Sequence, residues 1–202
     1  VKVFDAPYSP GEARNRSFTT QVTGGRLDLT LGGPTGWGVS AVIIRKIEAD
    51  PGDALGDFAL RDWRISPRYA NRDWWPIQQV RFGPEDNLAS PDIGGWTAVE
   101  ADAGGVVQLG DNTQAETGDV VYAMTTLVAE EGGPHWLNVA STSSAEVYVK
   151  GERVAYLPNV KGLQRDERTF EVPLRAGANT IVVKLQRYWE RHWMFYVSQG
   201  VG

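Results

Sequence analysis

Short runs of alternating apolar and polar residues, recurring about every ten residues, constrain the fold of this chain more than any other feature. Clusters of Gly, Pro, Asn and Asp separate the runs, and almost no segment keeps an apolar helical period beyond two turns. A period of two places every second side chain on one face of a strand, so each run predicts a strand with one buried face. Strands at this spacing predict an all-β chain, built as an antiparallel sandwich or barrel.

The strongest runs predict strands at residues 17–22, 26–31, 39–44, 120–128, 136–140, 146–150, 169–174, 180–185 and 194–197. Gly24-Gly25 predicts a tight hairpin, and Gly151 supplies the positive φ that a second hairpin requires. In the second hairpin, Val147 and Val149 should face inward, on the side opposite Tyr148. Pro173 predicts an edge strand or a bulge, because proline cannot donate to the hydrogen-bond ladder.

The domain organisation follows from one break in the pattern. Residues 48–57 (EADPGDALGD) are acidic and rich in Gly and Pro, which predicts a linker. Residues 58–202 then form one domain, with an opening strand near Trp63 and long aromatic-bearing loops up to Trp96. The three strands of residues 1–47 cannot bury both faces of a sheet. They either add strands to the following domain or close a second sandwich whose other strands lie on missing sequence.

Two segments carry a family resemblance. Residues 16–33 (RSFTTQVTGGRLDLTLGG) and 37–45 (WGVSAVIIR) resemble the closing strands of malectin-like and related galactose-binding-like carbohydrate modules. Thr23-Gly24-Gly25 and Ser40 replace the Asp-Gly and Asn that are usual there. The resemblance implies that residues 1–47 are the end of an incomplete malectin-like sandwich.

A second resemblance covers 122–126 (YAMTT), 136–154 (WLNVASTSSAEVYVKGERV), 172–185 (VPLRAGANTIVVKL) and 193–197 (WMFYV). These segments are similar to accessory jelly rolls of secreted bacterial glycoside hydrolases and polysaccharide lyases. The resemblance implies a galactose-binding-like jelly roll for residues 58–202. Lys150 replaces the usual Asn, and 141–144 (STSS) replace an acidic loop. The sequence therefore neither indicates nor excludes a structural calcium, and no other cofactor is expected.

Several classes of function lack support. With a net charge of -5 and no dense Lys/Arg cluster, nucleic acid is not an expected partner. The chain has no apolar run of membrane-spanning length, so no membrane partner is expected. The absence of cysteine excludes a disulfide scaffold, thiol catalysis and Cys-ligated zinc. His135 and His192 lack metal-ligand spacing, and no phosphate-binding or dinucleotide-binding glycine motif occurs.

Catalysis by paired carboxylates has no specific signal, and we assign no catalytic residue. Acidic residues in turn-like segments, where solvated charge is expected, are Glu85, Asp86, Asp92, Glu100, Asp102, Glu130, Glu131, Asp166 and Glu167. Whether the chain belongs to an enzyme remains open at this point, since any two carboxylates could be brought to catalytic separation.

Eight tryptophans are the compositional feature that points to a ligand. Large sandwich cores use Trp as filler, but flat aromatic faces also stack on the C–H faces of pyranose rings. The best candidate segment is 187–192 (RYWERH). Its candidate side chains are Trp189 and Tyr188 for stacking and Arg187, Glu190, Arg191 and His192 for hydrogen bonds. The alternative is that this loop packs on a neighbouring domain.

The second candidate is Trp74-Trp75. Adjacent residues of an extended strand point to opposite faces, so at most one ring should enter the core if the segment is extended. The other ring would be a binding platform or an interface anchor.

The sequence thus predicts a non-catalytic carbohydrate-binding or bracing module of a glycoside hydrolase or polysaccharide lyase, secreted or at the cell surface. Its expected partners are a polysaccharide or oligosaccharide and neighbouring domains. One alternative is the C-terminal fragment of a multi-domain polysaccharide-degrading enzyme whose catalytic part is on missing N-terminal sequence. The other is a structural or adhesion sandwich without glycan affinity.

Overall fold

The computed structural model describes residues 59–158, 163, 168–189 and 192–200. The chain separates into two units, Val1–Ala54 and Leu55–Gly202, and the described residues lie in the second. The strands predicted at 17–22, 26–31 and 39–44, the incomplete sandwich and the linker lie outside the described residues. Within the described part, no helix is long and apolar enough to cross a membrane.

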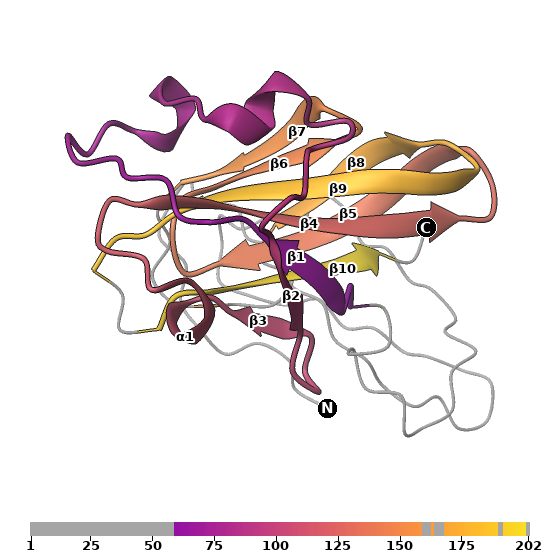
Figure 1. The fold of residues 1–202 in the computed structure, drawn as a ribbon. Helices are drawn as coiled ribbons and strands as arrows, with labels where there is room; N and C mark the ends of the chain where they lie inside the picture. Colours follow the sequence, from indigo (N-terminus) through magenta and orange to yellow (C-terminus); the bar gives the residue numbers. More distant parts are fainter. Residues whose placement is uncertain (1–58, 159–162, 164–167, 190–191, 201–202) are drawn as a thin grey trace, which may run out of the picture. The chain divides into compact units, whose positions relative to one another are not determined.

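The described residues form strands and a few short helices, coloured by sequence in Figure 1. The strands are β1 (Asp62–Ile65), β2 (Thr97–Glu100), β3 (Val106–Gln108), β4 (Val120–Ala129), β5 (Gly133–Ser141), β6 (Ala145–Val149), β7 (Glu152–Leu157), β8 (Arg168–Leu174), β9 (Gly177–Gln186) and β10 (Met194–Gly200). The helices are the 3-10 turns η1 (Ile77–Gln79) and η2 (Gly83–Asp86) and the single turn α1 (Gly110–Thr113).

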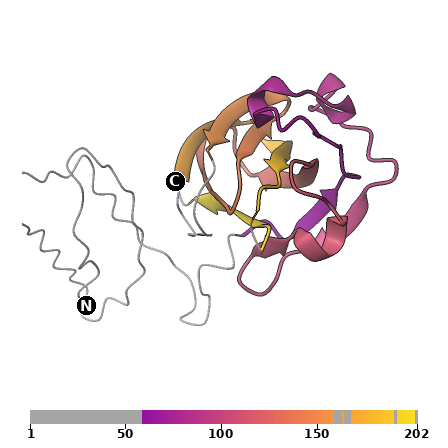
Figure 2. The same cartoon turned by 90° about the vertical axis from the view of Figure 1, so that its left-hand side faces the viewer.

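The strands form two antiparallel sheets, one in the order β2-β1-β4-β9-β6-β7 and the other in the order β3-β10-β5-β8. Between β4 and β10 the chain passes repeatedly from one sheet to the other, and only β6 and β7 are joined as a hairpin. This is an all-β antiparallel jelly-roll sandwich, as the sequence predicted. In Figure 2, which faces one end of the strands, the two sheets surround the interior.

Apolar side chains from the inner faces of both sheets fill that interior. Trp63 of β1 meets Phe195 of β10 edge to face, with ring centroids 4.8 Å apart, which joins the two layers. Trp193 is also buried, and its indole Nε1 donates to Ser143 Oγ at 2.8 Å. Trp96 is buried on the other face of the six-stranded sheet. Among the described tryptophans, these are the ones that serve as core.

The strands predicted within residues 120–197 are all present, with ends that differ by up to three residues. The alternating runs did not predict β2, β3 or β7. The strand expected near Trp63 is present as β1. β2 and β3 contain four and three residues, too few alternating positions for a local signal. β8 is an edge strand, which confirms the expectation from Pro173.

The β6–β7 hairpin turns through Lys150 (φ 51°) and Gly151 (φ 90°). Two positive φ angles in a two-residue loop are those of a type I′ turn, so the expected hairpin is confirmed. Val147 and Val149 face the core as predicted. Tyr148, on the opposite face, is buried as well. Reading the alternation as one buried and one exposed face was therefore wrong for this strand.

Residues 66–96, here called the covering segment, bury that second face. They leave β1, pass through η1 and η2 and return to β2, and in Figure 1 these turns lie over β6 and β7. The apolar layer between the covering segment and the sheet contains Leu88, Trp96, Val120, Tyr122, Tyr148 and Val182, with Tyr69, Val80, Phe82, Ile93 and Met124 at its margin. The long aromatic-bearing loops predicted here are present, and they form a third layer over the sheet.

Candidate functional site

Aromatic residues from two distant segments meet at one end of the sandwich. Trp74 and Trp75 belong to the covering segment, and Tyr188 and Trp189 follow β9, at the left-hand end in Figure 1. The ring centroids of Trp74 and Trp189 are 5.4 Å apart, and those of Tyr188 and Trp189 are 6.0 Å apart. Trp189 is 76% exposed, Trp75 54% and Trp74 43%. We call these four residues the aromatic site; the sequence had treated them as two separate candidates.

A turn built on Asn71 shapes the tryptophan half of the aromatic site. The backbone N–H of Trp74 donates to Asn71 O at 3.1 Å, and Asn71 Nδ2 donates to Trp75 O at 2.8 Å. Trp74 adopts a left-handed φ of 57°, which is uncommon for a residue with a bulky side chain. The segment is therefore not extended, the opposite-faces argument does not apply, and neither ring enters the core.

Gly118 allows this turn to approach the sheet. Its φ is 93°, and a Cβ placed on it would lie 2.8 Å from Asn71 O and 3.7 Å from Trp74 Cε2. A side chain at position 118 would therefore displace the loop that carries the tryptophans. The sequence analysis missed Gly118 and Asn71, because a glycine or an asparagine in a turn has no distinguishing local signal.

The remaining predicted residues have different surroundings. Arg187 donates from its guanidinium to Ala115 O, and its backbone N–H donates to Asp119 O at 2.9 Å. These bonds hold Arg187 against the chain that leads into β4. His192 is exposed near the start of β10. The predicted ligands Glu190 and Arg191 lie outside the described residues.

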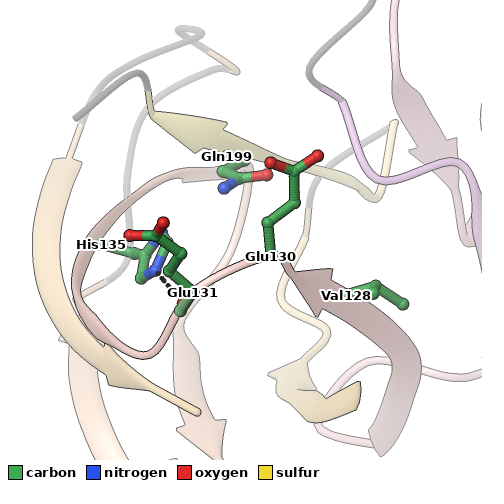
Figure 3. A pocket seen from close by; sticks show the side chains of 5 residues that line it. All are labelled: Val128, Glu130, Glu131, His135 and Gln199. Atoms are coloured by element: carbon green, nitrogen blue, oxygen red, sulfur yellow. Dashed lines mark hydrogen bonds between the residues drawn. The ribbon is translucent and has the colours of Figure 1, made fainter. Parts of the chain in front are cut away.

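A shallow pocket lies elsewhere, between β4, β5 and β10, and is drawn in Figure 3. His135 makes a 3.1 Å contact through Nε2 with the backbone oxygen of Glu131. The carboxylate of Glu130 extends away from His135 in the figure, so the two glutamates do not converge on one point. Val128 and Gln199 complete the lining. Within the described residues, no group of three His, Asp or Glu side chains could hold a metal ion.

One predicted solvated carboxylate is instead part of a buried ionic network. Lys184 of β9 is 1% exposed, and its Nζ lies 2.8 Å from Glu85 Oε1 and 3.4 Å from Glu146 Oε2. The expectation that acidic residues of turns are solvated was wrong for Glu85, because η2 places it over the sheet, next to Lys184. Nζ also donates to Ile77 O at 2.9 Å and to Val80 O at 2.6 Å.

Two buried tyrosines complete this network. The hydroxyl of Tyr122 donates to Glu85, and that of Tyr148 donates to Glu146 Oε2 at 2.9 Å. Burial, and next the adjacent carboxylate, raises the pKa of each tyrosine well above 10. Arg153 reaches Glu146 from the surface at 2.6 Å. The network fastens the covering segment to the sheet and is closed to ligands by that segment.

Comparison with known proteins finds no matching family model and no matching curated protein. Similar solved structures include a beta-glucosidase from Kluyveromyces marxianus (14% identity, 69% of this chain and 17% of that one, TM-score 0.43). A beta-glucuronidase from Ruminococcus gnavus is 8% identical over 70% of this chain and 28% of its own, with a TM-score of 0.45. A family 35 carbohydrate binding module from Clostridium thermocellum is 15% identical over 40% and 78%, with a TM-score of 0.28. This chain thus spans less than a fifth of the beta-glucosidase.

Proposed function

We propose that this chain is a carbohydrate-binding module whose ligand stacks on the aromatic site. The observation that carries the proposal is the approach of two exposed indole rings from distant segments, Trp74 and Trp189, next to the exposed side chain of Trp75. Large apolar rings that gather at one place on a surface mark an interaction site, because exposed apolar side chains without a function are usually isolated from one another. Ring faces of this size suit the flat C–H faces of sugars.

The polar residues around the rings fit a hydroxyl-bearing ligand. Arg72 and Asp73 are exposed next to Trp74, and His192 is exposed beyond Trp189. Arginine supplies paired donors and a carboxylate supplies acceptors, the combination that neighbouring hydroxyl groups require. Recognition by ring faces and hydrogen bonds needs no proton-transfer group, so the proposed role is binding without catalysis.

We further propose that the module is an accessory part of a secreted polysaccharide-degrading enzyme, with neighbouring domains on either the same or a separate polypeptide. The resemblance of residues 136–154 and 172–185 to galactose-binding-like accessory jelly rolls supports this role. We also propose that residues 1–47 are the end of a malectin-like sandwich, from the resemblance of residues 16–33 and 37–45, and that the acidic, Gly- and Pro-containing residues 48–57 are the linker to residues 58–202.

Replacing Trp189 or Trp75 with alanine should weaken polysaccharide binding about two- to tenfold, because each change removes a stacking face worth on the order of 0.5–1.5 kcal/mol. The measurement is affinity electrophoresis in native gels that contain hydroxyethylcellulose, galactomannan, xylan or polygalacturonate. Tyr156→Ala is the control, since it removes a ring exposed outside the aromatic site on the edge strand β7. No retardation of the wild-type protein by any polymer would favour the adhesion alternative.

A further inference from the structure

Gln186 lies directly beneath the aromatic site. It is the last residue of β9, and its side chain is 1% exposed. Its Nε2 donates to Trp75 O at 3.0 Å and to Gly118 O at 3.5 Å, while its Oε1 accepts a bond from the Tyr188 hydroxyl at 3.2 Å. One buried amide thus contacts both halves of the site, which are more than a hundred residues apart in sequence.

An amide side chain suits this position because it can donate to two carbonyls and accept from a hydroxyl at the same time. Gly118 O and Trp75 O each accept a bond from this amide, Trp75 O in addition to its bond from Asn71 Nδ2, and the tyrosine hydroxyl donates to it. A Gln side chain offers two N–H donors and one carbonyl oxygen, which matches these three partners. Its backbone N–H donates to Ser144 O at 3.1 Å, so the strand fixes where the amide lies. An aliphatic residue, such as the adjacent Leu185, would leave both carbonyls and the hydroxyl without this partner.

We propose that Gln186 is a positioning residue that holds Trp74-Trp75 and Tyr188-Trp189 at the spacing required for ligand binding. The inference rests on the proposed function and adds to it the group that sets the geometry of the site. The rings then need little further ordering when a ligand binds. Immobilising a flexible side chain costs about 0.5–1.5 kcal/mol, so loss of preorganisation in two rings should weaken binding about tenfold.

The discriminating variant is Gln186→Glu, compared with Gln186→Met. At neutral pH a carboxylate can only accept hydrogen bonds, so it would repel the carbonyls of Trp75 and Gly118. A protonated carboxyl regains one donor. We therefore expect Gln186→Glu to bind about tenfold more weakly than wild type at pH 7.5 and to recover toward pH 4.5, whereas Gln186→Met stays weak throughout. Binding is measured in the polymer-containing native gels described above.

Charged and titratable groups around position 186 are also present in the wild type, so its own pH profile is the baseline. They are Arg187 and Tyr188, which follow it, Asp119 before β4, and Lys184, two residues earlier on β9, with its own partners Glu146 of β6 and Glu85 of η2. A Gln186→Glu profile that merely parallels the wild-type profile would overturn the proposal. So would full affinity of Gln186→Met once its folded fraction is confirmed by near-ultraviolet circular dichroism.

A ligand-independent measurement separates this proposal from the proposed function. Trp74 and Trp189 are close enough for exciton coupling between their indoles, which gives a far-ultraviolet circular dichroism couplet. We expect the couplet to be lost in Trp189→Phe and Gln186→Met, and to return at low pH in Gln186→Glu. If the couplet behaves in this way but no polymer is bound, the positioning role stands and the binding proposal fails. An unchanged couplet in Gln186→Met refutes the positioning role, whatever the polymers show.

Discussion

Replacing Lys184 with methionine should lower the free energy of unfolding by about 3–5 kcal/mol, because it leaves two carboxylates in a covered environment without their main cation. Lys184 Nζ is the only group that contacts Glu85, Glu146 and the carbonyls of Ile77 and Val80 at once among the described residues. Methionine matches the length of the apolar stem but offers no donor. Urea denaturation followed by fluorescence measures the change.

Arg153→Met is the matched control for Lys184→Met. It removes the other cation of Glu146, but Arg153 is half exposed, so the loss should be at most about 1 kcal/mol. The double variant Lys184→Met/Glu146→Gln should be more stable than the sum of the single changes predicts, because it removes a buried charge together with its partner. A loss of less than 1 kcal/mol for Lys184→Met would show that the ionic network does not hold the covering segment.

Above pH 10 the protein should lose stability steeply, by about 1.4 kcal/mol per pH unit for each of Tyr122 and Tyr148. Burial, and then the adjacent Glu85 or Glu146, raises the pKa of these hydroxyls in the folded state. Below pH 10 the tyrosines are protonated in both states, and their contribution is fully present. As the pH rises above 10, only the unfolded chain releases these protons, so unfolding becomes favoured.

Urea titrations between pH 10 and 11.5 measure this slope. The Tyr122→Phe variant removes one of the two ionisations, so its stability should fall less steeply than that of the wild type by about 1.4 kcal/mol per pH unit. The comparison uses slopes, and it is therefore insensitive to any constant loss from the missing hydroxyl. Parallel slopes for the two proteins would mean that Tyr122 ionises equally readily in the folded and unfolded states.

The sequence alone predicted the sandwich and most of its long strands. Alternation is a local property, and each of β4, β8 and β9 contains enough residues to display it. The chemistry of glycine and proline is equally local, so Gly151 predicted a hairpin and Pro173 an edge strand or a bulge before any pairing was known. The strands that the alternating pattern did not predict are short, as β2 and β3 are, or directly follow a hairpin turn, as β7 does. They are recognised as strands by their hydrogen bonds to neighbouring strands.

The covering segment could not be predicted in this way. Lys184 and Gln186 alternate with Val183 and Leu185, a pattern that assigns the two polar side chains to solvent. Both are buried because residues 66–96 return over that face of the sheet. Such packing depends on contacts between segments about a hundred residues apart, for which a local period contains no information.

The sequence determined which residues could form the aromatic site. Adjacent aromatic residues such as Trp74-Trp75 and Tyr188-Trp189 can be identified from the sequence without knowledge of the fold. Only the tertiary structure decided that they form one site. The covering segment and the end of β9 meet there, and the Gln186 amide joins them. The physical reason is that ring stacking and hydrogen bonds act over a few ångströms in space, while the sequence specifies only the order along the chain.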